Sequence, residues 1–443
     1  MRTQGNSLGD AAIALYVALL PWEITRKFIP ILRSSYAGAD SISLLDGARL
    51  VIAVIFIFVL PVVLVRLASG RTVPGMPVIG TGVVVMSVGF VNSPDKGTAA
   101  AELFRFGFNL AAMVIIATFL VEVGQVRRII RWFCWSVDLA AVIVIVEFLT
   151  GKYLWVSALA PSGRFNGPFV DPNTTARYLL VAAVLSVFCS AEMRNWTRVW
   201  AVAEPLLLLA AMFLTGSRSS LAVTALVVLL MLVMADGHRR LAAIAAVPAI
   251  AVLMIGALAV MPAFAARLAS FTNPLALLGA RTALVTAGWH MFLDHPVIGV
   301  GTAGFPVQLL GRYSQYQSYY GAELTLSHTS VITTAAELGM LGLTWYLILG
   351  ARLYKSSRRS MSFRSTRTLA TGITLSLIAI FAQSQSEGRF WEEPLMWALF
   401  ALLLVLERIA SVEKAASSNA SAAPLDHGEQ SLSLAVPGAL IPA

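Results

Sequence analysis

Long apolar stretches, separated by short polar segments, follow one another along the chain to about residue 410. A helix that crosses a bilayer needs about 20 mostly apolar residues, and about twelve stretches come near this length. The pattern therefore predicts an all-α integral membrane protein with about twelve transmembrane helices. The predicted helices cover residues 9–24, 48–68, 76–92, 99–121, 128–149, 173–190, 197–215, 219–235, 241–261, 329–350, 368–386 and 391–410.

One polar interruption, residues 262–328, is much longer than the others. Within it, Arg281–Leu293 has a helical pattern but is too short to span a bilayer, so we expect a short interfacial helix. Asp294-His295-Pro296 should end this helix, because a proline disfavours helical backbone in the residue before it. A flexible turn is expected next, at the glycines Gly299, Gly301 and Gly304.

The residues after 410 are rich in alanine and serine. We expect residues 411–443 to form a disordered cytoplasmic tail and residues 1–410 to form one polytopic membrane domain. No internal repeat is evident, which argues against a transporter built from inverted repeats.

The composition agrees with a membrane protein. Of 443 residues, 58% are hydrophobic and 12% are charged, whereas about a quarter of a soluble domain is charged. The mean hydropathy is +0.78. These values exclude a soluble enzyme with a single anchor. The first apolar stretch leads into Pro21–Trp22–Glu23 and basic residues, so no cleavable signal peptide is expected.

The sequence lacks the common motifs for metal or nucleotide binding. It has no CxxC, HExxH, GxxxxGKS/T or GxGxxG pattern, so we expect no cofactor and no metal site. The two cysteines, Cys134 and Cys189, both fall in predicted helices. We expect them to pack as small apolar residues and not to form a disulfide.

Basic residues cluster at one set of helix ends. In the twelve-helix arrangement these clusters all lie on one side, which the positive-inside rule makes cytoplasmic. Both termini are then cytoplasmic, and segments 25–47, 150–172 and 262–328 face outward. The net charge of +9 suits anionic lipid headgroups and phosphates better than nucleic acid, because most basic residues cap apolar stretches. The clusters are Arg66/Arg71, Arg127/Arg128/Arg131, Arg194/Arg198, Arg239/Arg240 and Arg352/Lys355/Arg358/Arg359/Arg364/Arg367.

Arg218 lies in a very short outward loop, against the positive-inside rule. One explanation is an arginine that reaches to the lipid headgroups. The neighbouring Gly216, Ser217, Ser219 and Ser220 leave a second explanation open. Backbone N–H and hydroxyl donors at a helix N-terminus, together with a guanidinium, suit a phosphate.

Arg281 and His328 are the candidates in and after the long outer segment. Arg281 and His290 are nine residues apart, on opposite sides of a helix, so Arg281 is the candidate and His290 is expected to be structural, like His295. His328 precedes a predicted helix. Nearby positive charge would keep its imidazole neutral and able to act as a general base. Glu337, nine residues further on, faces away and is expected to bond to another helix.

The segment 164–176 is a second outward cluster of polar residues. Asn166-Gly167-Pro168 predicts a turn, and Asn173 or Thr174 is expected to cap the following helix. Arg164 and Arg177 are further candidates for ligand contact. Three charged residues inside predicted helices are expected to be paired with polar groups in the interior, namely Arg105, Asp138 and Glu147.

Four segments, in this order, resemble the O-antigen ligase and polymerase superfamily, bacterial membrane enzymes that use polyprenyl-diphosphate glycans. The resemblance covers roughly residues 160–350. Two positions depart from the pattern, because Thr329 replaces a frequent asparagine and Ser219 a frequent glycine. The segments are GRFNGPFVDPN (163–173), TGSRSS (215–220), FLDHPVIGVGTAGF (292–305) and HTSVITTAAELGMLG (328–342).

The resemblance implies a metal-independent, inverting glycosyltransferase in the bacterial cytoplasmic membrane, with its active site on the outer face. The donor would be an undecaprenyl-diphosphate-linked oligosaccharide, and the acceptor a glycan or a lipid-linked sugar. Arginines matching Arg218 and Arg281 would hold the diphosphate, with Arg164 and Ser217 as further donor-binding candidates. A histidine matching His328 would be the base.

The sequence leaves several alternatives. Ligation to a lipid carrier, polymerisation and protein O-glycosylation differ in their acceptor, which the sequence does not identify. A secondary transporter for an anionic solute would also need arginines in a helical bundle. The polar cluster at the outer face argues against a transporter, because transporters bind substrates near the membrane centre. A structural scaffold of the cell envelope has no positive feature in its favour.

Overall fold

The computed structural model describes residues 7–27, 33–34, 42–43, 46–68, 75–154, 164–189, 196–260, 262, 265, 274–316, 326–388 and 390–422. In this part of the chain the fold is helical, apart from two short paired strands, and each of the twelve predicted stretches forms a helix. The long helices are α1 (Ser7–Leu19), α2 (Gly47–Ala68), α3 (Met76–Asn92), α4 (Lys96–Phe119), α5 (Val123–Thr150), α6 (Pro172–Cys189), α7 (Trp196–Leu214), α8 (Arg218–Met234), α9 (His238–Val260), α11 (Pro274–Asp294), α13 (Ser330–Met361), α14 (Arg364–Ser384) and α15 (Pro394–Ala422). The short elements are η1 (Glu23–Lys27), β1 (Arg33–Ser34), β2 (Ile42–Ser43), α12 (Gly304–Leu310) and η4 (Ser314–Tyr316).

Seven helices of the described region are long and apolar enough to cross a membrane, namely α4, α5, α6, α9, α13, α14 and α15. The remaining five predicted helices are present as shorter apolar helices. The chain is therefore a multi-pass membrane protein.

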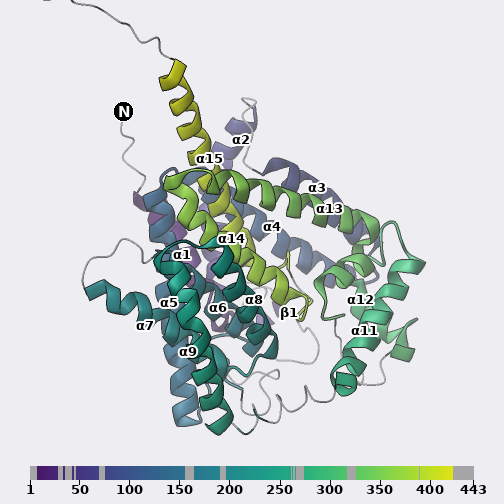
Figure 1. Cartoon of the computed structure of the whole chain (residues 1–443). Helices are drawn as coiled ribbons and strands as arrows, with labels where there is room; N and C mark the ends of the chain where they lie inside the picture. Colours follow the sequence, from purple (N-terminus) through teal and green to yellow (C-terminus); the bar gives the residue numbers. More distant parts are fainter. Residues whose placement is uncertain are drawn as a thin grey trace, which may run out of the picture.

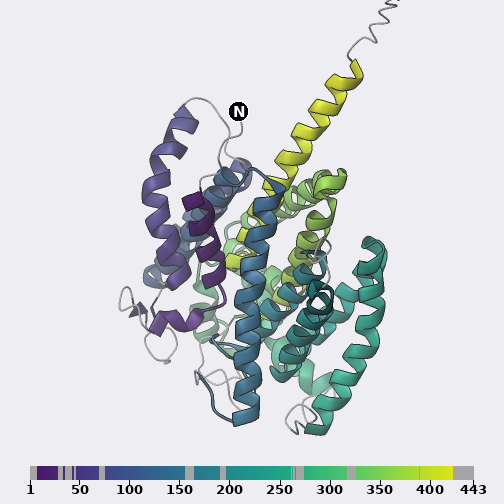
Figure 2. The same ribbon diagram turned by 90° about the vertical axis from the view of Figure 1, so that its left-hand side faces the viewer.

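The helices form a bundle with α6 and α15 at its centre (Figure 1). Of the residues in the most apolar stretch of each helix, 89% are buried in α6 and 78% in α15, but only 11% in α9. The C-terminal part of α15 projects beyond the other helices, as the turned view in Figure 2 also shows. The apolar surface of α9 therefore remains for lipid, and α6 and α15 are available to carry buried polar groups.

Aromatic side chains fill the interior between α3, α4, α13 and α15. The Phe106 ring lies edge-on to Trp345, Trp391 and Trp397, with ring centroids 5.7 to 5.9 Å apart. Edge-to-face packing of this kind adds stability beyond the area buried. Gly82 makes room for it, because a Cβ there would lie 2.9 Å from Phe106 Cζ and Trp345 Nε1.

The end of the bundle where α13 finishes is basic. Arg358 and Arg359 occupy the last turn of α13, and Glu407 of α15 accepts from Arg352 at 2.7 Å and Arg359 at 2.8 Å. On α5, Arg131 pairs with Glu204 of α7 at 3.1 Å. α13 begins at the opposite end, at Ser330, two residues after His328.

Several predicted boundaries were wrong, among them those of α11 and α15. α11 has 21 residues and begins at Pro274, because its apolar first turns extend the predicted interfacial helix Arg281–Leu293 backwards; its end at Asp294 is confirmed. α15 continues to Ala422, so the predicted disordered tail begins too early, since alanines after residue 410 extend the helix. Residues 423–443 lie outside the described part of the chain.

Of the three charged residues that were expected to be paired inside helices, two have partners. Glu147 accepts from the backbone N–H groups of Leu154 and Gly167, and Arg105 pairs with Glu102. The prediction was wrong for Asp138, whose buried carboxylate oxygens have no hydrogen-bond partner in the described region, because burial of a carboxylate does not by itself bring a partner into reach. Cys134 and Cys189 are free and buried, as predicted.

Candidate functional site

The turn before α6 is buried and fixed from two sides. The Gly167 N–H donates to Glu147 Oε2 at 2.9 Å, and the Val170 N–H donates to Glu23 Oε2 at 3.0 Å. Gly167 has φ +54°, a left-handed conformation that favours glycine. The predicted turn at this position is confirmed.

The residue that caps α6 differs from the prediction. The helix begins at Pro172, and Asp171 Oδ1 accepts from the Asn173 N–H at 3.0 Å. Proline suits the first helical position because it has no N–H to satisfy. The cap is therefore Asp171 and not Asn173 or Thr174.

Arg164 joins this turn to the turn between α7 and α8. Its side chain is buried, with 9% exposed. Arg164 Nε donates to the Thr215 carbonyl at 2.9 Å, and Nη2 donates to Asn173 Oδ1 at 2.6 Å. The guanidinium thus brings together two segments that sequence reasoning had marked separately.

The turn between α7 and α8 presents three serines and Arg218. Gly216 has φ +64°, and α8 then begins at Arg218, which is half-buried. Ser220 Oγ donates to Ser217 Oγ at 2.9 Å, and the Ser217 and Ser219 hydroxyls lie 3.2 Å apart. The serine hydroxyls bond to one another here, and the Ser217 side chain makes no capping bond to the helix.

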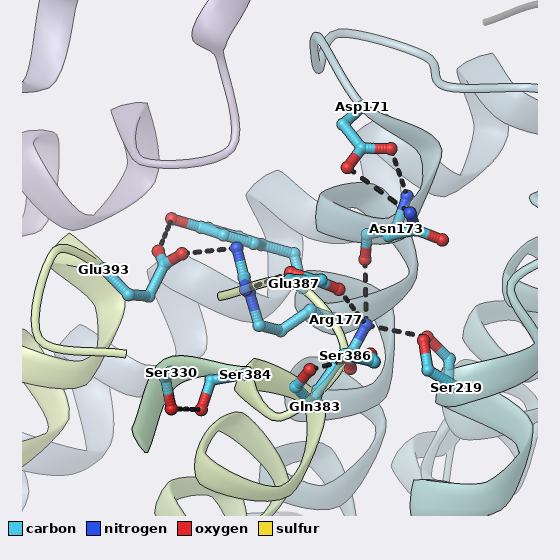
Figure 3. A network of polar contacts seen from close by, with 12 residues as sticks. Asp171, Asn173, Arg177, Ser219, Ser330, Gln383, Ser384, Ser386, Glu387 and Glu393 are labelled. Atoms are coloured by element: carbon cyan, nitrogen blue, oxygen red, sulfur yellow. Dashed lines mark hydrogen bonds and ion pairs between the residues drawn. The ribbon is translucent and has the colours of Figure 1, made fainter. Parts of the chain in front are cut away.

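Gln383, near the end of α14, connects three helices at this site (Figure 3). Its Nε2 lies within bonding distance of the Asn173 carbonyl at 3.0 Å, Ser220 Oγ at 2.8 Å and Glu387 Oε1 at 2.9 Å. Gln383 is fully buried. It therefore fixes the α14–α15 loop against the starts of α6 and α8.

Arg177 lies between two carboxylates of that loop (Figure 3). It pairs with Glu387 and with Glu393, each at 2.5 Å, and the Tyr178 hydroxyl donates to Glu393 at 2.9 Å. Burial, opposed by Arg177, raises the pKa of Glu387 to about 7. Arg177 is thus engaged by glutamates of this chain, which disfavours the predicted contact with a ligand.

His328 lies against the same loop. A Cβ on Gly388 would come 3.5 Å from both the N and Cα atoms of His328, and Thr329 Oγ1 donates to the Gln385 carbonyl at 3.4 Å. His328 is half-buried and has φ +59°, which is uncommon for a residue with a Cβ and recurs at functional sites.

Hydroxyl groups fix the start of α13 next to His328. Ser330 Oγ lies 2.9 Å from both Ser384 Oγ and the Tyr346 hydroxyl. Gln385 Nε2 donates to Ser330 Oγ at 2.7 Å. The Ser330–Ser384 contact appears in Figure 3. The backbone that carries His328 is therefore held to the end of α14.

Arg281 belongs to α11, and its side chain lies outside the described part of the structure. A Cβ on Gly288 would lie 2.6 Å from Ile332 Cγ2, and further on the Met340 N–H donates to the Pro296 carbonyl at 2.8 Å. The chains of α11 and the first half of α13 therefore run in the same direction. Arg281 lies about two turns before Gly288. It is therefore at the same end of the bundle as the start of α13.

The supporting residues behave largely as predicted. Glu337 is buried and accepts from the Phe305 N–H at 3.1 Å, so its predicted bond to another helix is confirmed. His295 directly follows the end of α11. His290 stacks on Tyr316 with ring centroids 5.6 Å apart and is exposed, which differs from the packed position expected for it.

Gln383, Glu387 and Glu393 were missed as members of the site. The available signal was three glutamates, Glu387, Glu392 and Glu393, around a short connection between two apolar stretches. They looked like ordinary helix ends because their partners are distant; Arg177 and Glu387 are separated by 210 positions.

Comparison with known families decides the relationship. Residues 206–347 match the family model described as O-antigen ligase, and the match includes Ser217, Arg218, Arg281 and His328. The match supports membership of the O-antigen ligase and polymerase superfamily. A search of curated proteins found no match. At the level of the family, the match supports glycan ligation or polymerisation in polysaccharide biosynthesis, with lipid-linked glycans as substrates at the bacterial inner membrane.

Proposed function

We propose that this O-antigen ligase family protein transfers a glycan from an undecaprenyl-diphosphate donor to an acceptor sugar hydroxyl, with inversion and without a metal. The observation that carries the proposal is the convergence of three segments on one end of the bundle. Arg164 joins the turn before α6 to the turn before α8, and Gln383 joins both to the loop against which His328 lies.

We place this end on the outer face of the inner membrane, with all twelve predicted helices crossing and both termini cytoplasmic. The basic end of the bundle supports this orientation, since Arg352, Arg358 and Arg359 lie in the C-terminal part of α13. The positive-inside rule makes such an end cytoplasmic. α13 starts beside His328, so the site lies at the opposite end.

The diphosphate binds Arg218 and Arg281, with Ser217 and Arg164 as further contacts. The N-terminus of α8 offers backbone N–H groups and the positive end of the helix dipole. Guanidinium groups make paired, charge-assisted bonds to phosphate oxygens. Negative charge builds up on the diphosphate as the glycosidic bond breaks, so these groups bind the transition state more strongly than the ground state.

His328 takes the proton of the acceptor hydroxyl. The acceptor oxygen forms a bond to the anomeric carbon from the face opposite the diphosphate. The bond from that carbon to the diphosphate oxygen breaks, and its electron pair leaves with the diphosphate. A neutral imidazole suits this step because its pKa range is close to physiological pH.

Release of polyprenyl diphosphate by purified protein tests the donor site. Arg218→Ala or Arg281→Ala should reduce release by roughly 10²- to 10³-fold, the usual effect of removing one group that stabilises developing charge. Arg312→Ala is the matched control, because Arg312 also belongs to the outer segment but pairs with Asp294 at 3.1 Å and is exposed. Full release by both site variants would contradict the assignment.

The choice of acceptor in the same assay distinguishes ligation, polymerisation and protein O-glycosylation. A lipid carrier sugar, a second donor glycan and a folded protein would be offered in separate reactions, and the account predicts release with one class. No release with any acceptor, together with counterflow of an anionic solute in liposomes, would support a transporter instead.

A further inference from the structure

The loop between α11 and α12 packs against α13 at a point where that helix is interrupted. Gly339 has φ 60° and ψ −151°, so the helix is interrupted there. The Val300 and Gly301 N–H groups donate to the carbonyls of Ala336 and Glu337, both at 2.9 Å. In return, the Met340 N–H donates to the Pro296 carbonyl at 2.8 Å. The loop thus satisfies backbone groups that an interrupted helix leaves open.

Glycines let the two backbones touch. A Cβ on Gly299 would lie 2.3 Å from the Glu337 carbonyl carbon, and a Cβ on Gly339 would lie 2.6 Å from that of Val297. Both glycines have positive φ. The turn predicted for this loop is present, and its glycines allow close contact between the two backbones.

The C-terminal end of α3 forms the third side of this junction. The Thr302 N–H donates to the Gly89 carbonyl at 3.0 Å, and Asn92 Nδ2 donates to the Gly299 carbonyl at 2.7 Å. A Cβ on Gly301 would lie 2.4 Å from Ser93 Cα. α3 lies outside the segment that matches the family model.

The junction links the two elements that carry the proposed reacting groups. α11 bears Arg281 and enters the loop at its end. The first half of α13 follows His328 and reaches the break nine residues after Ser330. Glu337 adds a bond to the N-terminus of α12. Backbone hydrogen bonds of the loop therefore connect the end of α11 to the first half of α13.

We propose that Asn92 is a positioning residue, which holds the loop so that the donor phosphates on Arg281 and the base His328 keep their relative placement. This inference rests on the proposed function. Asn92 is exposed, so its substitution leaves the packed interior intact. Displacements of about 1 Å far from the reacting atoms can cost about 10²-fold in rate. Loss of this single bond should act through kcat, with a smaller effect on the KM for the donor.

Asn92→Ala and Asn92→Asp test the proposal beside Val91→Ala, a neighbouring residue with 74% exposure. We expect the kcat of Asn92→Ala to be about tenfold lower than that of Val91→Ala. This loss is smaller than the roughly 10²-fold effect of a 1 Å displacement. Aspartate should lower it further, because a carboxylate oxygen would face the Gly299 carbonyl and repel it. The thermal unfolding temperatures of the folded variants should stay close together. Equal kcat values for all three proteins, or a loss of activity that follows only a loss of folded protein, would overturn the proposal.

Amide hydrogen exchange separates this inference from the proposed function. In Asn92→Ala, amides of residues 296–303 and 336–341 should exchange faster than in Val91→Ala, whether or not the assay supplies the right acceptor. Unchanged exchange would overturn the role of Asn92. A different outcome is faster exchange in Asn92→Ala while wild-type protein releases no polyprenyl diphosphate with any acceptor. That combination would count against the proposed function and would leave the role of Asn92 at the junction in place.

Discussion

His328 combines an unusual backbone with a position at the proposed centre of the site. Its left-handed φ of +59° costs roughly 1–2 kcal/mol for a residue with a Cβ. The neighbours that hold this conformation are the Gln385 carbonyl, which binds Thr329, and Gly388, which leaves room beside the His328 backbone. A fixed imidazole needs less reorganisation before it accepts a proton.

Two substitutions that both remove the imidazole test this backbone conformation. His328→Gly should have a free energy of unfolding about 1 kcal/mol higher than His328→Ala, because glycine adopts positive φ without a steric clash. Thermal unfolding of both variants in one detergent measures the difference. Equal stability of the alanine and glycine variants would argue against a left-handed backbone conformation at His328.

Glu387 should make the stability of the protein depend on pH. Burial raises the pKa of Glu387 from its ordinary value of 4.5 to about 7, against the opposing effect of Arg177. The folded state therefore favours the protonated carboxyl. Its contribution to stability is complete below about pH 4.5 and is lost as the pH rises through about 7. Relative to Glu387→Gln, wild-type protein should lose unfolding temperature across this window. If the difference in unfolding temperature between the two proteins stayed constant across this pH window, the raised pKa of Glu387 would be contradicted.

At the scale of elements, the break in α13 is the feature that most affects the site. An unbroken helix would carry the chain past the loop and leave the loop's backbone groups without these partners. The peptide groups on both sides of Gly339 bond to residues 296–301 instead. The break therefore converts one long helix into two parts, and the first part packs with α11.

Two glycines of α13 give a matched test of the break. Gly339→Ala should sharply lower the yield and unfolding temperature of folded protein, because its Cβ would meet backbone atoms of Val297 at a positive φ. Gly350→Ala is the control, since a Cβ there has nothing within 4 Å among the described residues and alanine favours a helix by up to about 1 kcal/mol. Equal stability of the two variants would show that the helix is not broken at Gly339.

The sequence allowed the helices to be predicted better than their connections. Apolar length predicted all twelve helices, because burial in lipid requires it. The break at Gly339 was not predictable, since one glycine inside an apolar stretch is compatible with a continuous helix. The start of α11 was also missed, because its apolar first turns extend the helix back to Pro274. Arg218, Ser217 and Arg164 were chosen from local pattern, whereas the roles of Gln383 and Glu387 depend on partners far along the chain.

At the scale of the whole molecule, the site draws on much more of the chain than the matched family segment. Residues 206–347 contain Arg218, Arg281 and His328. Arg164, Arg177, Gln383 and Glu387 lie outside this segment and hold its turns and helix starts in place. The bundle therefore has a basic end and, at its opposite end, a proposed site built from several segments.

The central claim is that His328 acts as the base at this site. The most direct test is single-turnover release of undecaprenyl diphosphate by wild-type protein, His328→Ala and His290→Ala, with saturating acceptor. His290 is the matched control, because it is an exposed histidine of the neighbouring helix that stacks on Tyr316. We expect a loss of roughly 10²- to 10⁴-fold for His328→Ala, the usual contribution of a general base, and near-normal release for His290→Ala. Normal release by His328→Ala would show that His328 is not the base.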